Sequence, residues 1–530
     1  MPQYELGQWL PDLPVVSLPG LRLCSNAIPT ARGYRPFPSP GLVSGKSALA
    51  SECRGAFSGE SENGTQFIVA GTDSNSSNPK LYFVFGSTVD WLDATPATAL
   101  STIDTTAKWD FDQYGNEVFA VAKGVDPQYV DVTNDPGPTN RFADLPSGAS
   151  QATTCAVFKN FLILGNLVGR GSNASAIGTR GNALHWSAVG NMTGTDSWPT
   201  VGTATASDVQ SDWQLLDGAG GSVTQIKPGG EYCAVFQERA TWRMDYIGAP
   251  NVFSFRLIES SIGCSVPRSA ISVNNVVYFL SNQGFMAFDG SGVRSIGTQR
   301  VDRTFLDQFD RVNSENVFAA HSPESQCVFW GLSDGSGYPQ TLYGYQYERD
   351  QWFTVSSAGL RLQAIFQALE PNVDGQLDYP PYSTQNMDTG SDLAVADLDR
   401  LGLTQGRTVL GYFDQSNKLG MFSGFDTPMQ MSFQTGDFEM PDTNRAVLNY
   451  IRPIHDGGSM TVLASGRNTM SESDSYKLLR DAKSNGVFLP SPGARVGGRY
   501  LSAVLATNAG EPAENVYGFD ADIRLGAAKR

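Results

Sequence analysis

The sequence predicts a mainly β fold: a β-propeller built from irregular four-stranded blades. Short runs of aromatic and β-branched residues alternate with polar or glycine-containing turns along most of the 530 residues, as in NNVVYFLSNQGFMAFDG (274–290). Three successive hairpins of this kind begin near Tyr232, Val276 and Gln326, at intervals of 44 and 50 residues. Repeats of roughly 40 to 50 residues are typical of propeller blades, and a stacked β-sandwich is the alternative.

Three regions differ in their composition, and a chain of 530 residues is too long for one ordinary core. Residues 1–50 contain closely spaced prolines, which exclude a helix and favour an extended arm that lies on the rest of the protein or on a neighbouring subunit. Residues 51–442 are predicted to be the propeller body, with insertions near 170–221 and 372–394. Residues 443–530 are predicted to be a C-terminal antiparallel β-domain.

Two stretches have helical character. Val301, Phe305, Leu306 and Phe309 recur at helical spacing in VDRTFLDQFDRV, which predicts a short amphipathic helix packed against the propeller edge. Within the C-terminal region, SYKLLRDAKS (475–484) is predicted to be a second short helix.

The charge balance limits the possible partners. The chain has 37 basic and 53 acidic residues, a net charge of −16, and no basic cluster. Tight binding of nucleic acid or of an anionic membrane needs an excess of Lys and Arg, so neither is expected. An acidic surface could still lie beside a duplex, because it repels phosphate and lets DNA slide past.

The cysteines and the N-terminal sequence indicate the compartment. The cysteines are scattered, most lie in apolar runs and none forms a CxxC, so buried free thiols in a reducing compartment are favoured over disulfides: Cys24, Cys53, Cys155, Cys233, Cys264 and Cys327. The N-terminus lacks the pattern of a signal peptide, and no apolar stretch approaches the ~20 residues that cross a bilayer. A soluble protein folded in a cytoplasm is expected.

The sequence offers no catalytic, cofactor-binding or metal-ligating residues, and a non-enzymatic protein is predicted. The three histidines, His185, His321 and His455, are far apart and belong to no HxH or HExxH motif. His185 lies in a predicted strand beside Trp186, where a packed core histidine is favoured over a ligand. No GxSxG motif occurs.

Two other motifs resemble known sites only superficially. Asp110 to Gly115 (DFDQYG) begins like a calcium loop, but Tyr114 and Val121 occupy positions that need ligands, so a turn between strands is favoured. The glycine-rich run 218–221 is followed by no Lys-Ser/Thr pair and no predicted helix, which argues against a phosphate-binding loop. The acids of a glycosidase could lie among the 53 acidic residues, but no motif identifies them.

The most distinctive residues are aromatic. Blade packing explains most of the tryptophans near predicted strand ends, and a carbohydrate-binding platform is the alternative: Trp186, Trp198, Trp242, Trp330 and Trp352.

Several stretches together resemble the tail hub or nozzle proteins of short-tailed bacteriophages. They are ALHWSAVGNMTGTDSWP (183–199), the run 234–290 with its Gly263 to Ser269 link and its Val277 to Gly290 hairpin, and GGRYLSAVLAT (497–507). The N-terminal PDLP…NAIPTARGYRPFPS is similar to the family's opening arm. The matches span most of the chain and describe strands and turns, whereas 170–221 and 372–394 fit no shared pattern.

The resemblance implies a structural protein of the virion tail, assembled in the host cytoplasm. It implies a hexameric ring of propeller subunits below the portal and its adaptor, lining the channel for genome retention and ejection. It also implies attachment of a fibre, spike or needle protein and passage of double-stranded DNA without sequence-specific binding. The acidic loop 374–392 is a candidate gate or docking surface, or an ordinary exposed loop. The alternatives are a glycan-degrading propeller enzyme and a monomeric carbohydrate-binding propeller.

Overall fold

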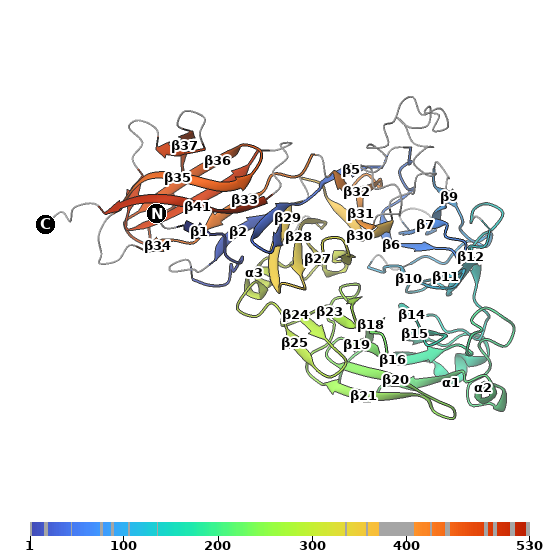
Figure 1. Ribbon diagram of the computed structural model, residues 1–530. Helices are drawn as coiled ribbons and strands as arrows, with labels where there is room; N and C mark the ends of the chain where they lie inside the picture. The colour runs from blue at the N-terminus through green and yellow to red at the C-terminus, as the bar shows by residue number, and fades with distance from the viewer. Residues whose placement is uncertain are drawn as a thin grey trace.

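A computed structural model of the chain describes residues 3–14, 20–43, 45–74, 78–85, 90–103, 106–134, 136–333, 337–356, 359–369, 408–424, 427–439, 446–481, 486–490, 496–508 and 515–525. The described residues form a ring of β-sheets joined to a second β-domain, which lies at the left of Figure 1 and also holds the N-terminus. The predicted mainly β propeller fold is confirmed.

The blades are four-stranded antiparallel meanders that follow one another along the chain. The first three blades comprise β6 (Cys53–Glu60), β7 (Gln66–Thr72), β8 (Leu81–Phe85) and β9 (Leu92–Asp93); β10 (Asp110–Tyr114), β11 (Glu117–Val121), β12 (Gln128–Asp131) and β13 (Ala143–Asp144); and β14 (Thr154–Phe158), β15 (Phe161–Val168), β16 (Thr179–Trp186) and β17 (Asp212–Leu215). The fourth and fifth comprise β18 (Val223–Pro228), β19 (Cys233–Gln237), β20 (Thr241–Gly248) and β21 (Val252–Glu259); and β22 (Ile271–Val273), β23 (Val276–Ser281), β24 (Gly284–Phe288) and β25 (Val293–Ser295).

Two further groups of four strands complete the ring. The sixth blade comprises β26 (Ala319–Ser322), β27 (Cys327–Ser333), β28 (Pro339–Gln346) and β29 (Gln351–Ser356). The seventh comprises β30 (Leu362–Leu369), β31 (Thr408–Asp414), β32 (Leu419–Gly424) and, from the N-terminal segment, β5 (Ser39–Leu42). The first strands of neighbouring blades are in contact all the way round, and β30 returns to β6. The ring is therefore closed within one chain, and its last sheet is completed by a strand from the start of the sequence.

The predicted repeat corresponds to the blade repeat. The hairpins predicted near Tyr232, Val276 and Gln326 begin with β19, β23 and β27, the second strands of three successive blades. The region near 170–221 holds η1 (Gly171–Asn173), α1 (Ala174–Ile177) and α2 (Ala204–Asp208), together with the outer strands of the third blade. The predicted insertion at 372–394 and the candidate gate at 374–392 lie outside the described residues.

The N-terminal segment and the C-terminal region form the second β-domain together. The N-terminal strands are β1 (Gln3–Glu5), β2 (Leu21–Ser25), β3 (Ala27–Thr30) and β4 (Gly33–Pro36). The C-terminal strands are β33 (Ser432–Thr435), β34 (Phe438–Glu439), β35 (Ala446–Asp456), β36 (Met460–Arg467), β37 (Lys477–Asp481), β38 (Phe488–Pro490), β39 (Gly497–Gly498), β40 (Tyr500–Thr507) and β41 (Asn515–Leu525). Strands β1 and β4 pair with β41, and β2 pairs with β33 on one side and with β29 of the sixth blade on the other. The N-terminal segment thus connects the domain to the ring.

One of the two predicted helices is present. Helix α3 (Asp302–Gln308) buries Phe305, whose ring lies 4.6 Å from that of Phe285 and 5.2 Å from that of Tyr343. Its N-terminus is held by the arm, because Asp12 accepts hydrogen bonds from the backbone N–H groups of Arg303 and Thr304. A short 3₁₀ turn, η2 (Ser314–Asn316), follows.

The helix predicted within 475–484 is wrong, because Lys477–Asp481 is the strand β37, paired with β36 and β38. Only Leu479 of this strand is buried, while Leu478 is 60% exposed. One buried residue gives no apolar stripe for a helix to pack, whereas neighbouring strands on both sides satisfy the backbone.

The cysteines behave as predicted: all six are buried free thiols. Burial raises the pKa of Cys53 and Cys327 to about 12, so these side chains are inert apolar groups at neutral pH. Among the residues that the structure describes, no helix is both long and apolar enough to cross a membrane.

Replacing Gly284 in the β23–β24 hairpin by alanine is expected to lower the free energy of unfolding by about 1–3 kcal/mol. Gly284 has φ +121°, and an added Cβ would overlap the carboxylate of Asp302, which accepts the Phe285 N–H at 3.0 Å. Chemical denaturation would measure the loss. Gly292→Ala in the same blade is the control, because a Cβ there meets nothing within 4 Å. Equal effects of the two substitutions would contradict this explanation.

Candidate functional site

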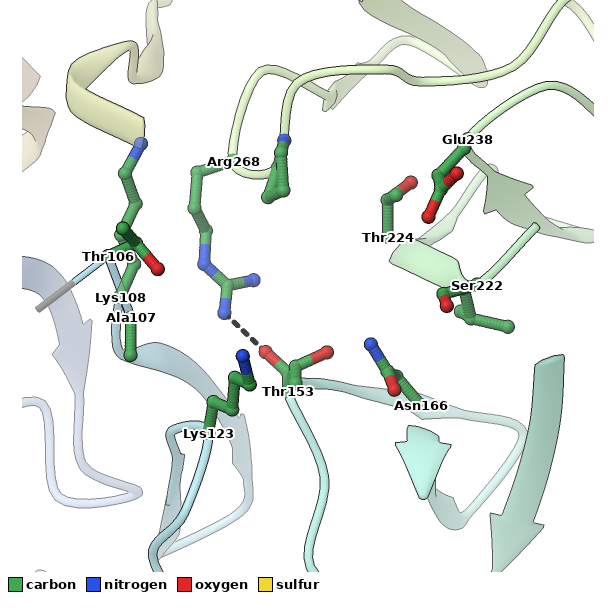
Figure 2. A pocket seen from close by; sticks show the side chains of 12 residues that line it. Thr106, Ala107, Lys108, Lys123, Thr153, Asn166, Ser222, Thr224, Glu238 and Arg268 are labelled. Atoms are coloured by element: carbon green, nitrogen blue, oxygen red, sulfur yellow. Dashed lines mark hydrogen bonds between the residues drawn. The ribbon is translucent and has the colours of Figure 1, made fainter. Parts of the chain in front are cut away.

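A cavity of about 280 Å³ lies on the face of the ring where the last strand of each blade is linked to the first strand of the next. Its lining comes from three successive blades, the second to the fourth, and from the links that precede and follow them (Figure 2). The inter-blade links contribute Thr106, Ala107, Lys108, Thr153, Ser222, Pro267 and Arg268, and the blades themselves contribute Lys123, Asn166, Val223, Thr224 and Glu238. The cavity is therefore assembled only when these blades are in place.

Arg268 is the central side chain of the site. It is 9% exposed, and its backbone is in the left-handed region at φ +69°. Its Nη2 donates to the Thr153 carbonyl at 2.7 Å, and its Nη1 lies 2.5 Å from Oδ2 of Asp110. A bulky residue held at positive φ is strained, and the contacts with Asp110 of the second blade and with Thr153 of the link before the third blade hold it there.

Asp110 is the counter-charge behind Arg268. It is 4% exposed at the start of β10, and its Oδ2 accepts hydrogen bonds from the Thr154 hydroxyl at 2.8 Å and the Cys155 N–H at 3.1 Å. Lys227 lies 3.9 Å from its Oδ1. Burial raises the pKa of Asp110, but Arg268, Lys227 and the hydrogen bonds together outweigh burial and lower the pKa below its usual value. Asp110 is therefore an ionised group that ties the second blade to the third and fourth blades and to the link before the fifth.

Two bulged strands point polar side chains into the cavity. Asn166 has φ +62° and lies where the pairing of β15 with β16 shifts register between Gly165 and Leu167. Thr224 lies at a similar shift between β18 and β19. Its hydroxyl donates to the Cys264 carbonyl at 2.8 Å, which leaves the oxygen able to accept. Bulges re-aim side chains and are common beside functional sites.

The cavity is polarised. Figure 2 shows Lys108, Lys123 and Arg268 on one side of the open space, and Ser222, Thr224 and Glu238 on the other. Lys108 is held by the sixth blade, because its Nζ donates to the Val317 carbonyl at 2.5 Å and lies 3.9 Å from the ring centre of Phe318. The ammonium of Lys108 is therefore directed away from the cavity, and Lys123 and Arg268 are the cations of this side.

The motifs that resemble known sites, and the tryptophans, have defined places in the described part of the chain. Within the described ranges, no group of three or more His, Cys, Asp or Glu side chains is placed to hold a metal ion. The segment 110–115 is the β10–β11 hairpin and not a calcium loop. Four of the five tryptophans named above are buried, which supports blade packing: Trp186, Trp198, Trp330 and Trp352.

His185 is a core residue, as predicted. It is fully buried; its Nδ1 lies 3.0 Å from the Ser150 hydroxyl, and its ring packs edge-on against Trp198 at 4.8 Å. Its Nε2 has no hydrogen-bond partner among the described residues. An imidazolium would leave a buried charge unpaired, and burial lowers the pKa of His185 to about 3.

The His185 resonances are expected to stay unchanged between pH 8 and about pH 4, because the imidazole remains neutral in the folded state. The unfolded chain protonates near pH 6.5. The stability that this group contributes is therefore complete above pH 6.5 and is lost as the pH falls toward 3. Proton NMR of the histidine Hε1 signals, assigned with His185→Gln, measures the titration. A His185 signal with a midpoint near pH 6.5 would contradict its burial.

Sequence reasoning missed Asp110 and Arg268 as partners, because 158 residues separate them. Both were visible in the sequence, Asp110 in the calcium-like stretch and Arg268 in the Gly263 to Ser269 link. Only the closed ring brings them together.

No protein-family model matches the chain, and no curated protein matches it either. Solved structures with a similar arrangement include YCF48 bound to D1 peptide, at 10% sequence identity, 74% of this chain, 98% of that chain and a TM-score of 0.35. They also include the extracellular domain of the putative one component system BT4673 from B. thetaiotaomicron, at 9% identity, 85% of this chain, 48% of that chain and a TM-score of 0.38. Apo AztD from Citrobacter koseri matches at 13% identity, 57% of this chain, 86% of that chain and a TM-score of 0.31. With TM-scores this low, these likenesses support no conclusion about function.

Proposed function

We propose that the protein is a non-enzymatic structural component of a bacteriophage tail, a hub or nozzle subunit that contributes to the channel for genome retention and ejection. The observation that carries the proposal is that one stretch of the chain both resembles the family in sequence and has the fold that the resemblance implies. The stretch 234–290, which resembles this family, folds as blade strands and a blade-to-blade link of a propeller, the fold that the resemblance implies.

The construction of the chain supports a mechanical role. The ring is closed by its own N-terminal strand β5, and β2 bridges the ring to the second β-domain through pairings with β29 and β33. The β2 strand thus connects the two parts by backbone pairing, as expected of a subunit that forms a wall.

The charge also suits a conduit. A net charge of −16 disfavours adhesion to phosphate, and acidic residues on the lumen would keep the duplex moving. Under this proposal the hexamer encloses the channel, and the outer surfaces bind the adaptor and a fibre, spike or needle protein.

Light scattering of the purified protein, alone and mixed with the adaptor protein encoded by the same phage, tests the proposal. A mass of six chains, or a monomer that becomes hexameric on the adaptor, is expected. Duplex DNA in the same experiment should not co-elute at physiological salt. A monomer that does not bind the adaptor, or one that degrades host surface polysaccharide, would overturn the proposal in favour of a binding or catalytic propeller.

A further inference from the structure

We propose that the polarised cavity between the second and fifth blades binds a small hydroxylated carboxylate of the sugar-acid class. This site goes beyond the proposed tail function, which requires no small ligand. The carboxylate would lie toward Lys123 and Arg268, and the hydroxyl groups toward Ser222, Thr224 and Glu238.

Arg268, on the basic side of the cavity, is the group that would bind the carboxylate. The Nη1 of Arg268 is paired with Asp110 at 2.5 Å and its Nη2 donates to the Thr153 carbonyl, whereas its buried Nε has no hydrogen-bond partner in the described part of the chain. Figure 2 shows the guanidinium directed into the space that the lining residues enclose. Buried donors without acceptors are rare in folded proteins, and a ligand oxyanion supplies acceptors that suit a guanidinium.

The side of the cavity that carries Glu238 argues against a site for a simple anion such as phosphate. Glu238 is exposed at the cavity wall and would repel a second negative group, whereas its carboxylate accepts hydrogen bonds from hydroxyls. Ser222, Thr224 and the bulge residue Asn166 add donors and acceptors beside it. A ligand with one carboxylate and several hydroxyls matches both sides, whereas a dicarboxylate or a bare phosphate matches only one.

The size of the cavity agrees with this class. A volume of about 280 Å³ exceeds what a single oxyanion fills and is near the lower end of small-molecule sites, which run from about 300 Å³. The positive charge on the basic side of the cavity acts only over a short range, because the chain as a whole is acidic. Long-range attraction therefore contributes little, and binding depends on the short-range arrangement.

Isothermal titration calorimetry with sodium D-glucuronate tests the site on the full chain. D-glucose, which lacks the carboxylate, and sodium acetate, which lacks the hydroxyls, are the matched probes. Glucuronate is expected to bind at least about tenfold more tightly than either probe. Glucose cannot make the charged hydrogen bond of the carboxylate, and acetate cannot make the neutral hydrogen bonds of the hydroxyls; either loss corresponds to about this factor. Lys123→Gln and Glu238→Gln, both at exposed positions, should each weaken glucuronate binding about tenfold.

Lys159→Gln is the control, because Lys159 lies at the β14–β15 turn, at the other end of β14 from Thr153, and pairs with Glu231 at 2.9 Å. It should leave binding unchanged. The proposal is overturned by the absence of glucuronate binding, by acetate or inorganic phosphate binding as tightly, or by binding that neither cavity variant alters. None of these results bears on whether the chain forms a hexamer, so the tail function is tested separately.

Discussion

Asp110→Asn is expected to lower the free energy of unfolding by about 3–5 kcal/mol, the cost of leaving a buried charge without its partner. The substitution keeps the shape of the side chain and removes the negative charge beside Arg268, which is 9% exposed and tied to Asp110 at 2.5 Å. Lys227, 3.9 Å away, loses the same partner. Guanidinium denaturation followed by tryptophan fluorescence measures the change.

The control is Glu231→Gln, which removes an ion pair of similar length from the surface. Glu231 is 90% exposed and lies 2.9 Å from Lys159, so its loss should change stability by less than about 1 kcal/mol. Adding Arg268→Gln to Asp110→Asn should restore part of the loss, since the unpaired cation is then gone. If Asp110→Asn lowers the free energy of unfolding no more than Glu231→Gln does, Asp110 does not hold the blades together.

The pH dependence follows from the lowered pKa of Asp110. A carboxyl whose folded pKa is depressed contributes stability that is complete above its unfolded value of about 3.9 and is lost as the pH falls through the folded pKa. The difference in stability between the wild type and Asp110→Asn should therefore be constant near neutrality and shrink below about pH 4.

Phe37→Ala is expected to cost about 3–5 kcal/mol, as large-to-small substitutions of a buried phenylalanine do. Phe37 belongs to the N-terminal segment and is 2% exposed, and its ring lies 5.5 Å from that of Phe329 in β27 and 5.3 Å from that of Phe422 in β32. Its backbone donates to Asn26 and accepts from Met429, each at 2.9 Å. Removing the ring should loosen the strand that closes the propeller.

Thermal unfolding and limited proteolysis of Phe37→Ala would measure this effect. Leu42→Ala is the matched control, because Leu42 lies in β5 of the same segment but is 52% exposed, and its loss should be within about 0.5 kcal/mol of the wild type. If the two substitutions destabilise the protein equally, the N-terminal segment does not close the ring by packing.

The sequence predicted features that depend on neighbouring residues. The β23–β24 hairpin, helix α3 and the burial of His185 follow from apolar runs, turn residues and helical spacing that lie within about 12 residues of one another. The blade repeat was visible for the same reason, since each blade is a local meander.

Features that depend on distant pairing were not visible. Strand β5 pairs with β32, although Leu42 and its partner Gly420 are 378 positions apart, and the proline-rich stretch around β5 gives no hint of that partner. The strand β37 was mistaken for a helix because its residues have good helix propensity, and pairing with β36 and β38 overrides that preference. The contact of Arg268 with Asp110 likewise exists only because the ring brings the link between the fourth and fifth blades against the second blade.

Electron microscopy of the purified protein assembled on its adaptor tests the central claim most directly. The claim is that this propeller chain is a wall subunit of a tail channel. Class averages with six copies of the ring-shaped subunit around a central opening, each joined to a second β-domain, are the result that we expect. Isolated single propellers, or a ring of copies with no opening along its axis, would contradict the claim.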